Sequence, residues 1–361
     1  MPKIRVLVVD DSVVIRRLLS DILSQDPEIE VAGTAPNGKI ALSKLTQINP
    51  DLVTLDIEMP ELDGLETLVP LRKQFPKLPV IMFSTLTERG AMSTLDALAR
   101  GASDYVTKPA NVGSVNAGMQ QVKDQLIPKI KSLCQQKLPP RAPTATIARS
   151  PLRRPPAAAA PARAPEVLVI GSSTGGPQAL ATVLRELPKD FPIPIAVVQH
   201  MPPVFTRHLA ARLDQECALE VAEATAGEVL RPGLVLIAPG DFHLELVRQG
   251  TQVVTALQQG PPENSCRPAV DVLFRSAAQV FGPGCLGVVL TGMGQDGMRG
   301  SEHIVATGGM VLAQDEATSV VWGMPRAVAE AGLASQVVPL TSIASELTRR
   351  AKAARRIAVL N

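Results

Sequence analysis

Three polar side chains in the C-terminal half of the chain could together form a nucleophilic catalytic site. Ser173 lies in Gly171-x-Ser173-x-Gly175, the spacing of a nucleophile elbow, whose tight turn exposes a serine hydroxyl above a sheet. His200 ends an apolar run and could accept the serine proton. Asp296 lies in a glycine-rich loop after another apolar run and could orient the imidazole. The pattern predicts acyl transfer by a Ser-His-Asp triad.

The residue pattern alone leaves structural interpretations open. A Gly/Ser turn needs no catalytic role, and phosphate binding is the other use of such a turn, although G-x-G-x-x-G fails at Ser173. His200 could equally be a structural histidine. The other histidines suit the role of base less well: His208 lies on a helix-like segment, His243 in a hairpin-like region, and His303 on a helix-like segment after Asp296.

A second set of polar side chains follows successive strand-like runs in the N-terminal third. Asp10 and Asp11 follow the first run, Asp56 the third, Ser84 the fourth and Lys108 the fifth. Three carboxylates brought together favour a shared hard cation such as Mg²⁺. Asp56 could then attack phosphorus, while Ser84 and Lys108 donate to the phosphoryl oxygens. Any one of these acids alone could be an ordinary turn residue.

The elements that must position these residues alternate between strand and helix. Ile4–Val9 is a continuous apolar run typical of a buried strand, and Ser12 can cap a helix that begins at Val13. Strand-like runs recur through residues 166–170, 193–198 and 284–290, with a hairpin-like region at 233–256. The fold class expected is therefore α/β, with two doubly wound parallel-sheet domains and an antiparallel hairpin in the second. Functional groups gather at the carboxyl ends of strands in such sheets.

Composition divides the 361-residue chain into three parts. We predict domains at residues 1–122 and 166–361, joined by a helix end and a Pro/Ala/Arg-rich linker at 123–165. The net charges are −3, −3 and +8 respectively, so the folded parts are acidic and no nucleic-acid partner is expected. No apolar run reaches membrane-spanning length, no signal-peptide pattern opens the chain, and the four cysteines form no C-x-x-C pair. We expect a cytoplasmic protein without membrane insertion.

Residues 1–122 resemble response-regulator receiver domains. The resemblance is carried by Asp10, Asp11, Asp56, Ser84 and Lys108, and by the segment at residues 56–64. It implies a flavodoxin-like fold, phosphorylation at Asp56, Mg²⁺ held by the three aspartates, and a histidine kinase as phosphoryl donor. Tyr105 stands at the family's aromatic switch position, with Ser84 and Lys108 as further switch residues, although half-buried packing would equally explain this tyrosine.

Residues 166–361 resemble the catalytic domain of bacterial chemotaxis protein-glutamate methylesterases. The matching stretches are residues 170–177, 199–203, 268–276 and 290–297. The resemblance implies that Ser173 attacks methylated glutamates of chemoreceptors with His200 as base and Asp296 as its orienting acid. It also implies a backbone N–H of Met293 as oxyanion donor, deamidation of glutamine at the same site, and no cofactor there. Cys266 stands where we expect histidine, and we expect this departure to affect only local substrate contacts.

Two non-catalytic interpretations compete with a phosphorylation-activated hydrolase. A scaffold would keep the fold without chemistry, and a transcription factor would call for a basic helix-turn-helix, which the acidic second domain does not suggest. An esterase of a non-chemotactic signalling array would share the chemistry. The basic cluster on the helix-like segment 341–357 is interpreted as a solvated face.

Overall fold

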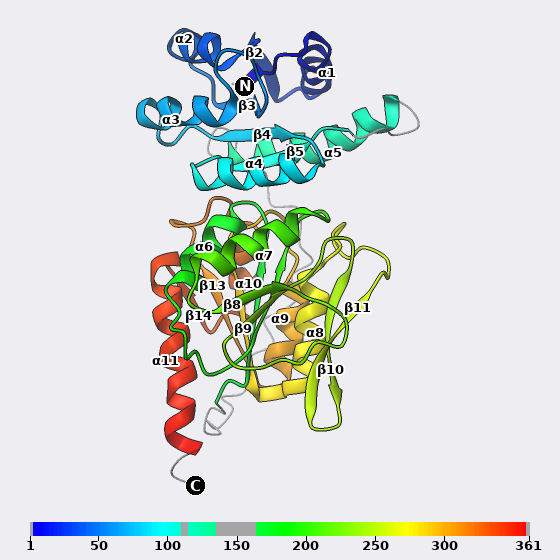
Figure 1. Ribbon diagram of the computed structural model, residues 1–361, viewed down its shortest axis with the longest axis vertical. Coiled ribbons are helices and arrows are strands. Elements are labelled where there is room, and N and C mark those ends of the chain that lie inside the picture. Colours follow the sequence, from blue (N-terminus) through cyan, green and yellow to red (C-terminus); the bar gives the residue numbers. More distant parts are fainter. Residues whose placement is uncertain (1–2, 110–114, 135–163, 359–361) are drawn as a thin grey trace. The chain divides into compact units, whose positions relative to one another are not determined.

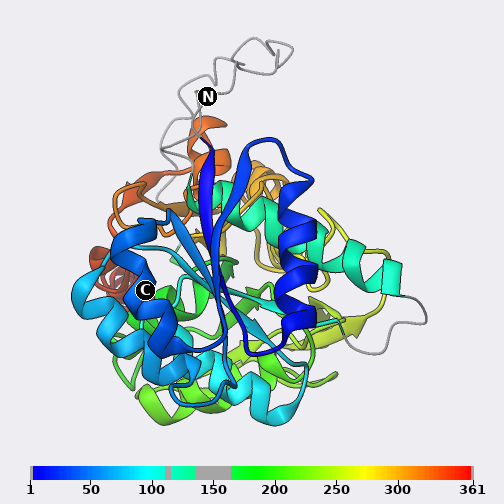
Figure 2. The same ribbon diagram turned by 90° about the horizontal axis from the view of Figure 1, so that it is seen from above.

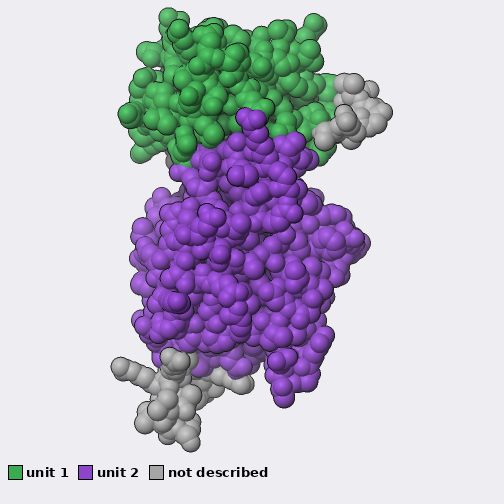
Figure 3. All heavy atoms as spheres, in the orientation of Figure 1, with its two compact units in different colours: residues 1–85, 100–162 green, residues 86–99, 163–361 purple. Residues whose placement is uncertain are grey.

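The computed structural model describes residues 3–109, 115–134 and 164–358, whose elements are labelled in Figure 1. Most of the predicted linker, residues 135–163, lies outside these ranges. Residue contacts divide the chain into two compact units, residues 1–85 with 100–162 and residues 86–99 with 163–361 (Figure 3). The domain limits at residues 122 and 165 stay a prediction.

The first unit contains a five-stranded parallel sheet with the strand order β2-β1-β3-β4-β5. Its strands are β1 (Ile4–Val9), β2 (Ile29–Ala35), β3 (Leu52–Asp56), β4 (Val80–Ser84) and β5 (Asp104–Thr107). The helices between and after these strands are α1 (Val13–Ser24), α2 (Gly38–Ile48), α3 (Gly64–Gln74), α4 (Glu88–Ala99) and α5 (Val115–Leu133). Helices α1 and α5 pack together on one side of the sheet, and α2 and α3 on the other (Figure 2). This order is the predicted doubly wound topology.

The first helix shows why the local sequence folds as predicted. Ser12 has extended backbone angles, and its hydroxyl accepts a hydrogen bond of 3.4 Å from the backbone N–H of Ile15. The apolar side chains Leu19, Ile22 and Leu23 recur at helical spacing and are buried against the sheet. The predicted cap and helix start are therefore confirmed.

The second unit contains a seven-stranded parallel sheet with the strand order β14-β13-β12-β6-β7-β9-β8. Its strands are β6 (Val167–Ser172), β7 (Ile195–Gln199), β8 (Glu220–Glu223), β9 (Leu234–Ile237), β12 (Cys285–Val289), β13 (Met310–Gln314) and β14 (Gln336–Val338). Its helices are α6 (Gly176–Arg185), α7 (Phe205–Glu216), α8 (Val270–Phe281), the 3₁₀ turn η2 (Gly282–Gly284), α9 (Met298–Ala306), α10 (Met324–Glu330) and α11 (Leu340–Ala358). The predicted parallel α/β architecture is confirmed for this unit as well.

The predicted hairpin exists, but its limits were wrong. Strands β10 (His243–Gln249) and β11 (Gln252–Gln258) pair antiparallel in a separate two-stranded sheet. The start of the predicted region instead forms β9, which pairs parallel with β7 and β8. Four consecutive buried apolar residues make β9 suitable for the interior of a parallel sheet, a pattern that alternation within a hairpin does not produce.

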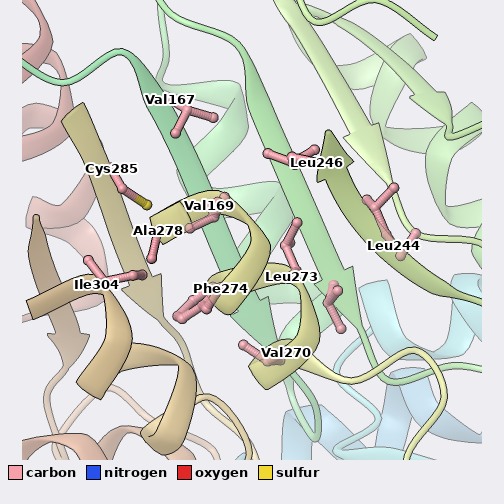
Figure 4. Packing of buried hydrophobic residues seen from close by; sticks show 14 of the residues in the cluster. Val167, Val169, Leu244, Leu246, Val270, Leu273, Phe274, Ala278, Cys285 and Ile304 are labelled. Carbon is pink, nitrogen blue, oxygen red and sulfur yellow. The ribbon is translucent and has the colours of Figure 1, made fainter. Parts of the chain in front are cut away.

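A hydrophobic core of the second unit lies between the parallel sheet, α8, α9 and the hairpin (Figure 4). Val167 and Val169 of β6 pack here with Leu273 and Phe274 of α8. The start of α8 approaches β6 closely, because a Cβ added at Gly171 would lie 2.3 Å from a methyl carbon of Val270. This contact holds the N-terminus of α8 against the strand that leads to Ser173.

Across residues 3–109, 115–134 and 164–358, the helices lack the combination of length and apolar character that crossing a bilayer requires.

Candidate functional site

The three predicted catalytic residues follow three adjacent strands. Ser173 directly follows β6, His200 follows β7, and Asp296 lies in the loop after β12. Strand β6 lies between the other two in the sheet, with β12, β13 and β14 on one side and β7, β9 and β8 on the other, so the strand order reverses at β6. Such a reversal of strand order is where ligands bind in doubly wound sheets. The topology thus brings residues far apart in sequence to one edge of the sheet.

The turn at Ser173 has the strand–turn–helix form expected of a nucleophile elbow. The backbone N–H of Ser173 donates to the carbonyl of Thr291 at 3.0 Å, and Ser173 is half-buried. Gly175 adopts φ 76°, in the left-handed region that favours glycine. At Gly176 a Cβ would lie only 1.9 Å from Oε1 of Gln199. Both glycines are therefore required for α6 to start directly after the serine.

His200 and Asp296 form a direct pair. The Nε2 atom of His200 lies 2.8 Å from Oδ2 of Asp296, whose side chain is buried. Burial alone would raise the pKa of Asp296, but the His200 imidazole and backbone N–H groups outweigh it and hold that pKa below its ordinary value. Burial would lower the pKa of His200, yet the bonds to Asp296 and Cys266 raise it above its ordinary value. The carboxylate thus stabilises the protonated imidazole.

The second ring nitrogen of His200 faces Cys266. Its Nδ1 lies 3.5 Å from the Cys266 Sγ, so this thiol contacts the predicted catalytic base itself. The expectation that Cys266 affects only substrate contacts was therefore wrong, because the chain brings residue 266 back across the imidazole. Within the described ranges no hydrogen bond joins the Ser173 hydroxyl to His200. Nδ1 is the nitrogen that remains for the serine proton.

The loop after β12 touches the serine turn through Gly292, the residue before Met293. A Cβ added at Gly292 would lie 2.9 Å from the Ser173 Cβ, so the two segments touch. The backbone N–H of Met293 donates no hydrogen bond to any residue that the structure describes. An oxyanion hole requires a donor that is free in this way, and the role of Met293 stays a prediction.

Two of the alternative histidines have structural partners. His243 accepts a hydrogen bond at Nδ1 from the backbone N–H of Ala269 and donates from Nε2 to the carbonyl of Pro261, at 3.2 and 3.1 Å. In α9, Nδ1 of His303 lies 2.9 Å from the carbonyl oxygen of Arg299. Both imidazoles therefore serve local structure, which leaves His200 as the histidine paired with Asp296.

Sequence reasoning missed one polar residue that connects two strand ends. Gln199 is buried; its Oε1 accepts from the Ser172 hydroxyl at 2.7 Å, and its Nε2 donates to the carbonyl of Ser173 at 2.9 Å. It therefore links the backbone of the serine turn to the strand that carries His200. The available signal was a long amide at the end of an otherwise apolar strand, where burial requires hydrogen-bond partners.

Two further residues missed from the sequence contact Asp296. Asn264 donates from Nδ2 to Oδ1 of Asp296 at 2.9 Å, and the backbone N–H of Asp271 donates to the same oxygen at 3.0 Å. Neither lies at a strand end, so the rule that identified the other polar residues did not reach them.

The predicted acidic cluster of the first unit also assembles. Asp10 and Asp56 are buried, Asp11 is exposed, and one carboxylate oxygen of each lies within 4.8 Å of the others. The Lys108 ammonium lies 2.8 Å from Oδ1 of Asp56 and 3.3 Å from Oδ2 of Asp10. Four of the predicted side chains therefore meet at the carboxyl ends of β1, β3 and β5.

The charge balance of this cluster suits a divalent cation. Burial raises the pKa of Asp56 to about 6, with the Asp10 charge acting in the same direction and Lys108 opposing it. The Oδ2 atom of Asp56 is buried and has no hydrogen-bond partner among the described residues. Carboxylate oxygens are the ligands that Mg²⁺ prefers. The donor set therefore fits the predicted magnesium ion.

The two other predicted switch residues lie on neighbouring strands. Ser84 ends β4, and its buried hydroxyl lies 3.4 Å from the carbonyl of Thr85. Tyr105 on β5 is buried, with the Lys129 ammonium 5.1 Å from the centre of its ring. Burial, the larger cause, and the Asp104 charge both raise the pKa of Tyr105 well above its ordinary value, so the phenol stays neutral.

Comparison with known proteins identifies the family. A protein-glutamate methylesterase/protein-glutamine glutaminase of Nocardioides sp. is 59% identical over 357 residues, covering 97% of this chain and 96% of that protein. This chain belongs to that family. A relative with the same name from Trichodesmium erythraeum is 53% identical over 97% of this chain and 99% of its own length.

Family models and a solved structure agree with this assignment. The model of the CheB methylesterase matches residues 168–347 of this methylesterase-family chain, and the response regulator receiver domain model matches residues 6–118. The crystal structure of the Thermotoga maritima CheB methylesterase catalytic domain is 48% identical, with a TM-score of 0.51, and covers 51% of this chain and 98% of that one. The chain thus combines a receiver with a methylesterase-type domain.

Proposed function

We propose that this protein is a phosphorylation-activated serine hydrolase that demethylates glutamate methyl esters and deamidates glutamines on chemoreceptors. The observation that carries the proposal is the His200–Asp296 pair at the ends of strands flanking the strand that leads to Ser173. A scaffold would have no need of a buried carboxylate that holds an imidazole beside a half-buried serine turn. Family membership supports the same reaction class.

In the first half of the reaction, the Ser173 Oγ attacks the γ-carbonyl carbon of a methylated glutamate. The Nδ1 atom of His200 takes the serine proton, while Asp296 stabilises the resulting imidazolium through Nε2. The negative charge on the carbonyl oxygen is met by the backbone N–H of Met293. When the intermediate collapses, the bond to the methoxy group breaks and His200 returns the proton to the departing methanol.

Water completes the cycle by attacking the acyl-enzyme. His200 accepts a proton from the water, the bond to Ser173 breaks, and the serine recovers its hydroxyl as the product leaves as glutamate. A glutamine substrate passes through the same acyl-enzyme, with ammonia leaving in place of methanol. These steps use side chains and one backbone donor, and we propose no cofactor for this site.

We propose that Asp56 of the receiver accepts a phosphoryl group from a chemotaxis histidine kinase and that this raises hydrolase activity. Asp10, Asp11 and Asp56 would hold Mg²⁺, which neutralises charge on the incoming phosphoryl group when bound. Lys108 lies within reach of both buried carboxylates and would donate to a phosphoryl oxygen, as would the Ser84 hydroxyl. Tyr105 would report the phosphorylated state. We place these reactions in the cytoplasm.

The decisive experiment measures methanol release from receptor membranes whose glutamates carry labelled methyl esters. We expect Ser173→Ala to reduce release to the uncatalysed background and to abolish labelling by a fluorophosphonate probe. Ser345→Ala, at an exposed serine of α11, is the matched control and should retain both signals. Methanol release by Ser173→Ala at the rate of the unmodified protein would refute the mechanism.

A further inference from the structure

The surroundings of Asp296 assign a role to two residues that take no direct part in the reaction. We infer that Asn264 and Asp271 are positioning residues, which hold the Asp296 carboxylate so that its Oδ2 faces His200. The inference rests on the proposed function, since it concerns how the triad's acid is oriented. It follows from three arrangements: helix caps exchanged between α8 and α9, an amide bridging two carboxylates, and the conformation of the loop that carries this amide.

Helices α8 and α9 cap each other through these two aspartates. Neither Ala269 nor Gly297, the residues at their own N-caps, offers a side chain to the first turn. Asp296, just before α9, accepts from the backbone N–H groups of Val270 and Asp271 at the start of α8, at 2.7 and 3.0 Å. A carboxylate at this position satisfies donors that a helix start leaves unpaired.

The cap in the opposite direction comes from Asp271. Its Oδ1 accepts from the backbone N–H groups of Gly297 and Gly300, at 2.9 and 2.7 Å. Gly297 immediately follows Asp296 and has φ 90°, so this bond holds the backbone at the point where the acid is attached. The side chain of Asp271 therefore determines where the Asp296 backbone lies, and the start of α8 determines how its carboxylate is turned.

Asn264 connects the two carboxylates. Its Nδ2 lies 2.9 Å from Oδ2 of Asp271 and 2.9 Å from Oδ1 of Asp296, so the two hydrogens of one amide serve both acids. Two buried carboxylates close enough to share one amide repel each other unless donors lie between them. By occupying Oδ1 of Asp296, the amide leaves Oδ2 as the oxygen that receives the His200 proton.

The loop conformation fits this task. Asn264 and Ser265 have φ values of 51° and 62°, which side-chain-bearing residues rarely adopt and which asparagine tolerates best. The next residue is Cys266, which contacts the other face of His200. A single short loop thus contacts both members of the His200–Asp296 pair, although it belongs to neither of the strands that carry them.

The test compares Asn264→Ala with Glu263→Gln in the full-length protein, by kinetics of methanol release. Glu263 is the neighbouring residue, and its ion pair with Arg275 ties the same loop to α8 without touching Asp296. We expect Asn264→Ala to lower kcat about tenfold and to leave KM within about twofold of its value in the unmodified protein. This is the effect expected from the loss of one hydrogen bond to a charged group. Glu263→Gln should retain kcat. An equal loss in both variants would overturn the inference, because general loosening of the loop would then explain it.

Coupling to Asp296 provides the readout that a purely structural role would not move. In an Asp296→Asn background, Asn264→Ala should lower kcat by less than about twofold more. The reason is that Asn264 acts through the Asp296 carboxylate, which this background no longer contains. Full additivity would contradict the assignment. Asp271→Ala removes the acceptor of the reverse cap and should also lower kcat while leaving KM unchanged; unaltered kcat there would remove Asp271 from the proposal.

These outcomes are separable from failure of the proposed function. If Ser173→Ala remained active, the hydrolase mechanism itself would be wrong. If Ser173→Ala were inactive while Asn264→Ala kept its kcat, the mechanism would stand and the positioning role would be refuted.

Discussion

Asp56 and Asp296 are two buried aspartates at strand ends, and their surroundings shift the two carboxyl pKa values in opposite directions. Each is 2% exposed. Asp296 accepts hydrogen bonds on both oxygens, from three backbone N–H groups, the Asn264 amide and His200. Asp56 accepts from the backbone N–H of Ile57 and from Lys108, both at Oδ1, while its Oδ2 is left without a partner among the described residues.

The pKa values follow the number of fixed donors. Burial raises the pKa of Asp56 to about 6, whereas the donors around Asp296 outweigh burial and lower its pKa below the ordinary value. The comparison teaches that burial at a strand end does not by itself determine the state of a carboxylate. At Asp296 the protein supplies the donors that hold a permanent anion. At Asp56 it leaves Oδ2 without a partner among the described residues, as the proposed cation and phosphoryl group would require.

The largest expected effect on hydrolase activity comes from Asp296, whose carboxylate accepts hydrogen bonds on both oxygens. Asp296→Asn should lower kcat for methanol release by about 10⁴-fold, because an amide nitrogen facing Nε2 no longer accepts its proton and the wrong tautomer is favoured. The folded state should persist, since the amide oxygen can still cap α8. Circular dichroism checks the fold, and a kcat within tenfold of the unmodified protein would contradict the comparison.

Asp56, whose carboxylate has hydrogen-bond partners on only one oxygen, should instead be needed for regulation. Asp56→Asn should reduce phosphoryl incorporation from acetyl phosphate to background, since an amide is not a nucleophile for phosphorus. Hydrolase activity with the phosphodonor present should then equal the activity without it. Radiolabel on the protein and methanol release measure the two quantities in one preparation. Stimulation of Asp56→Asn by acetyl phosphate would show that another residue accepts the phosphoryl group.

The pH dependence of the hydrolase tests the charge balance around His200. The base must be neutral, and Asp296 raises its pKa, so kcat/KM should rise with pH through a midpoint above the ordinary histidine value of about 6.5. In Asp296→Asn the stabilising charge is lost, and the midpoint should move to lower pH by one unit or more. Fluorophosphonate labelling rates across pH measure both. An unchanged midpoint in Asp296→Asn would show that the charge of Asp296 does not raise the pKa of the base.

Magnesium should stabilise the receiver through the unpaired oxygen of Asp56. At saturating Mg²⁺ we expect the melting transition of this unit to rise by about 3–8 °C, since a ligand that binds the folded state stabilises it. Asp10→Asn removes one carboxylate and should shrink the shift. Differential scanning calorimetry with Mg²⁺ and with a chelator provides the measurement; an unchanged shift in Asp10→Asn would exclude that residue as a ligand.

The smallest effect is expected at Cys266, on the other face of His200. Cys266→Ala removes the thiol from Nδ1 and should raise the rate of Ser173 labelling by about threefold, the effect of one weak hydrogen bond. Cys217→Ala, at a half-buried cysteine on the C-cap of α7, is the matched control. A fall in the labelling rate would mean that the thiol assists the base instead of competing for it.

Much of the fold and of both sites follows from local patterns. The run at β1, the Ser12 cap and the glycines around Ser173 act over a few residues, so a linear reading detects them. Polar residues that end apolar strands lead to Asp10, Asp56, Lys108, His200 and Asp296, because parallel strands present their carboxyl ends at one edge. Strands β8, β9, β13 and β14 were not predicted as strands of the parallel sheet. Strands β8 and β14 have only four and three residues, and β9 lies in the region predicted as a hairpin. Strand β13 was missed although its length equals that of β3 and β4.

The amino-acid sequence by itself determined which side chains could do chemistry and on which elements they lie. Only the tertiary structure decided which of them meet and with what charge. Asn264 and Cys266 show the difference: each contacts a residue 32 or 66 positions away, and no pattern near either one records its partner. Hydrogen bonds to a buried carboxylate depend on where several separate segments end in space, and packing of α8 and α9 against the sheet sets those positions.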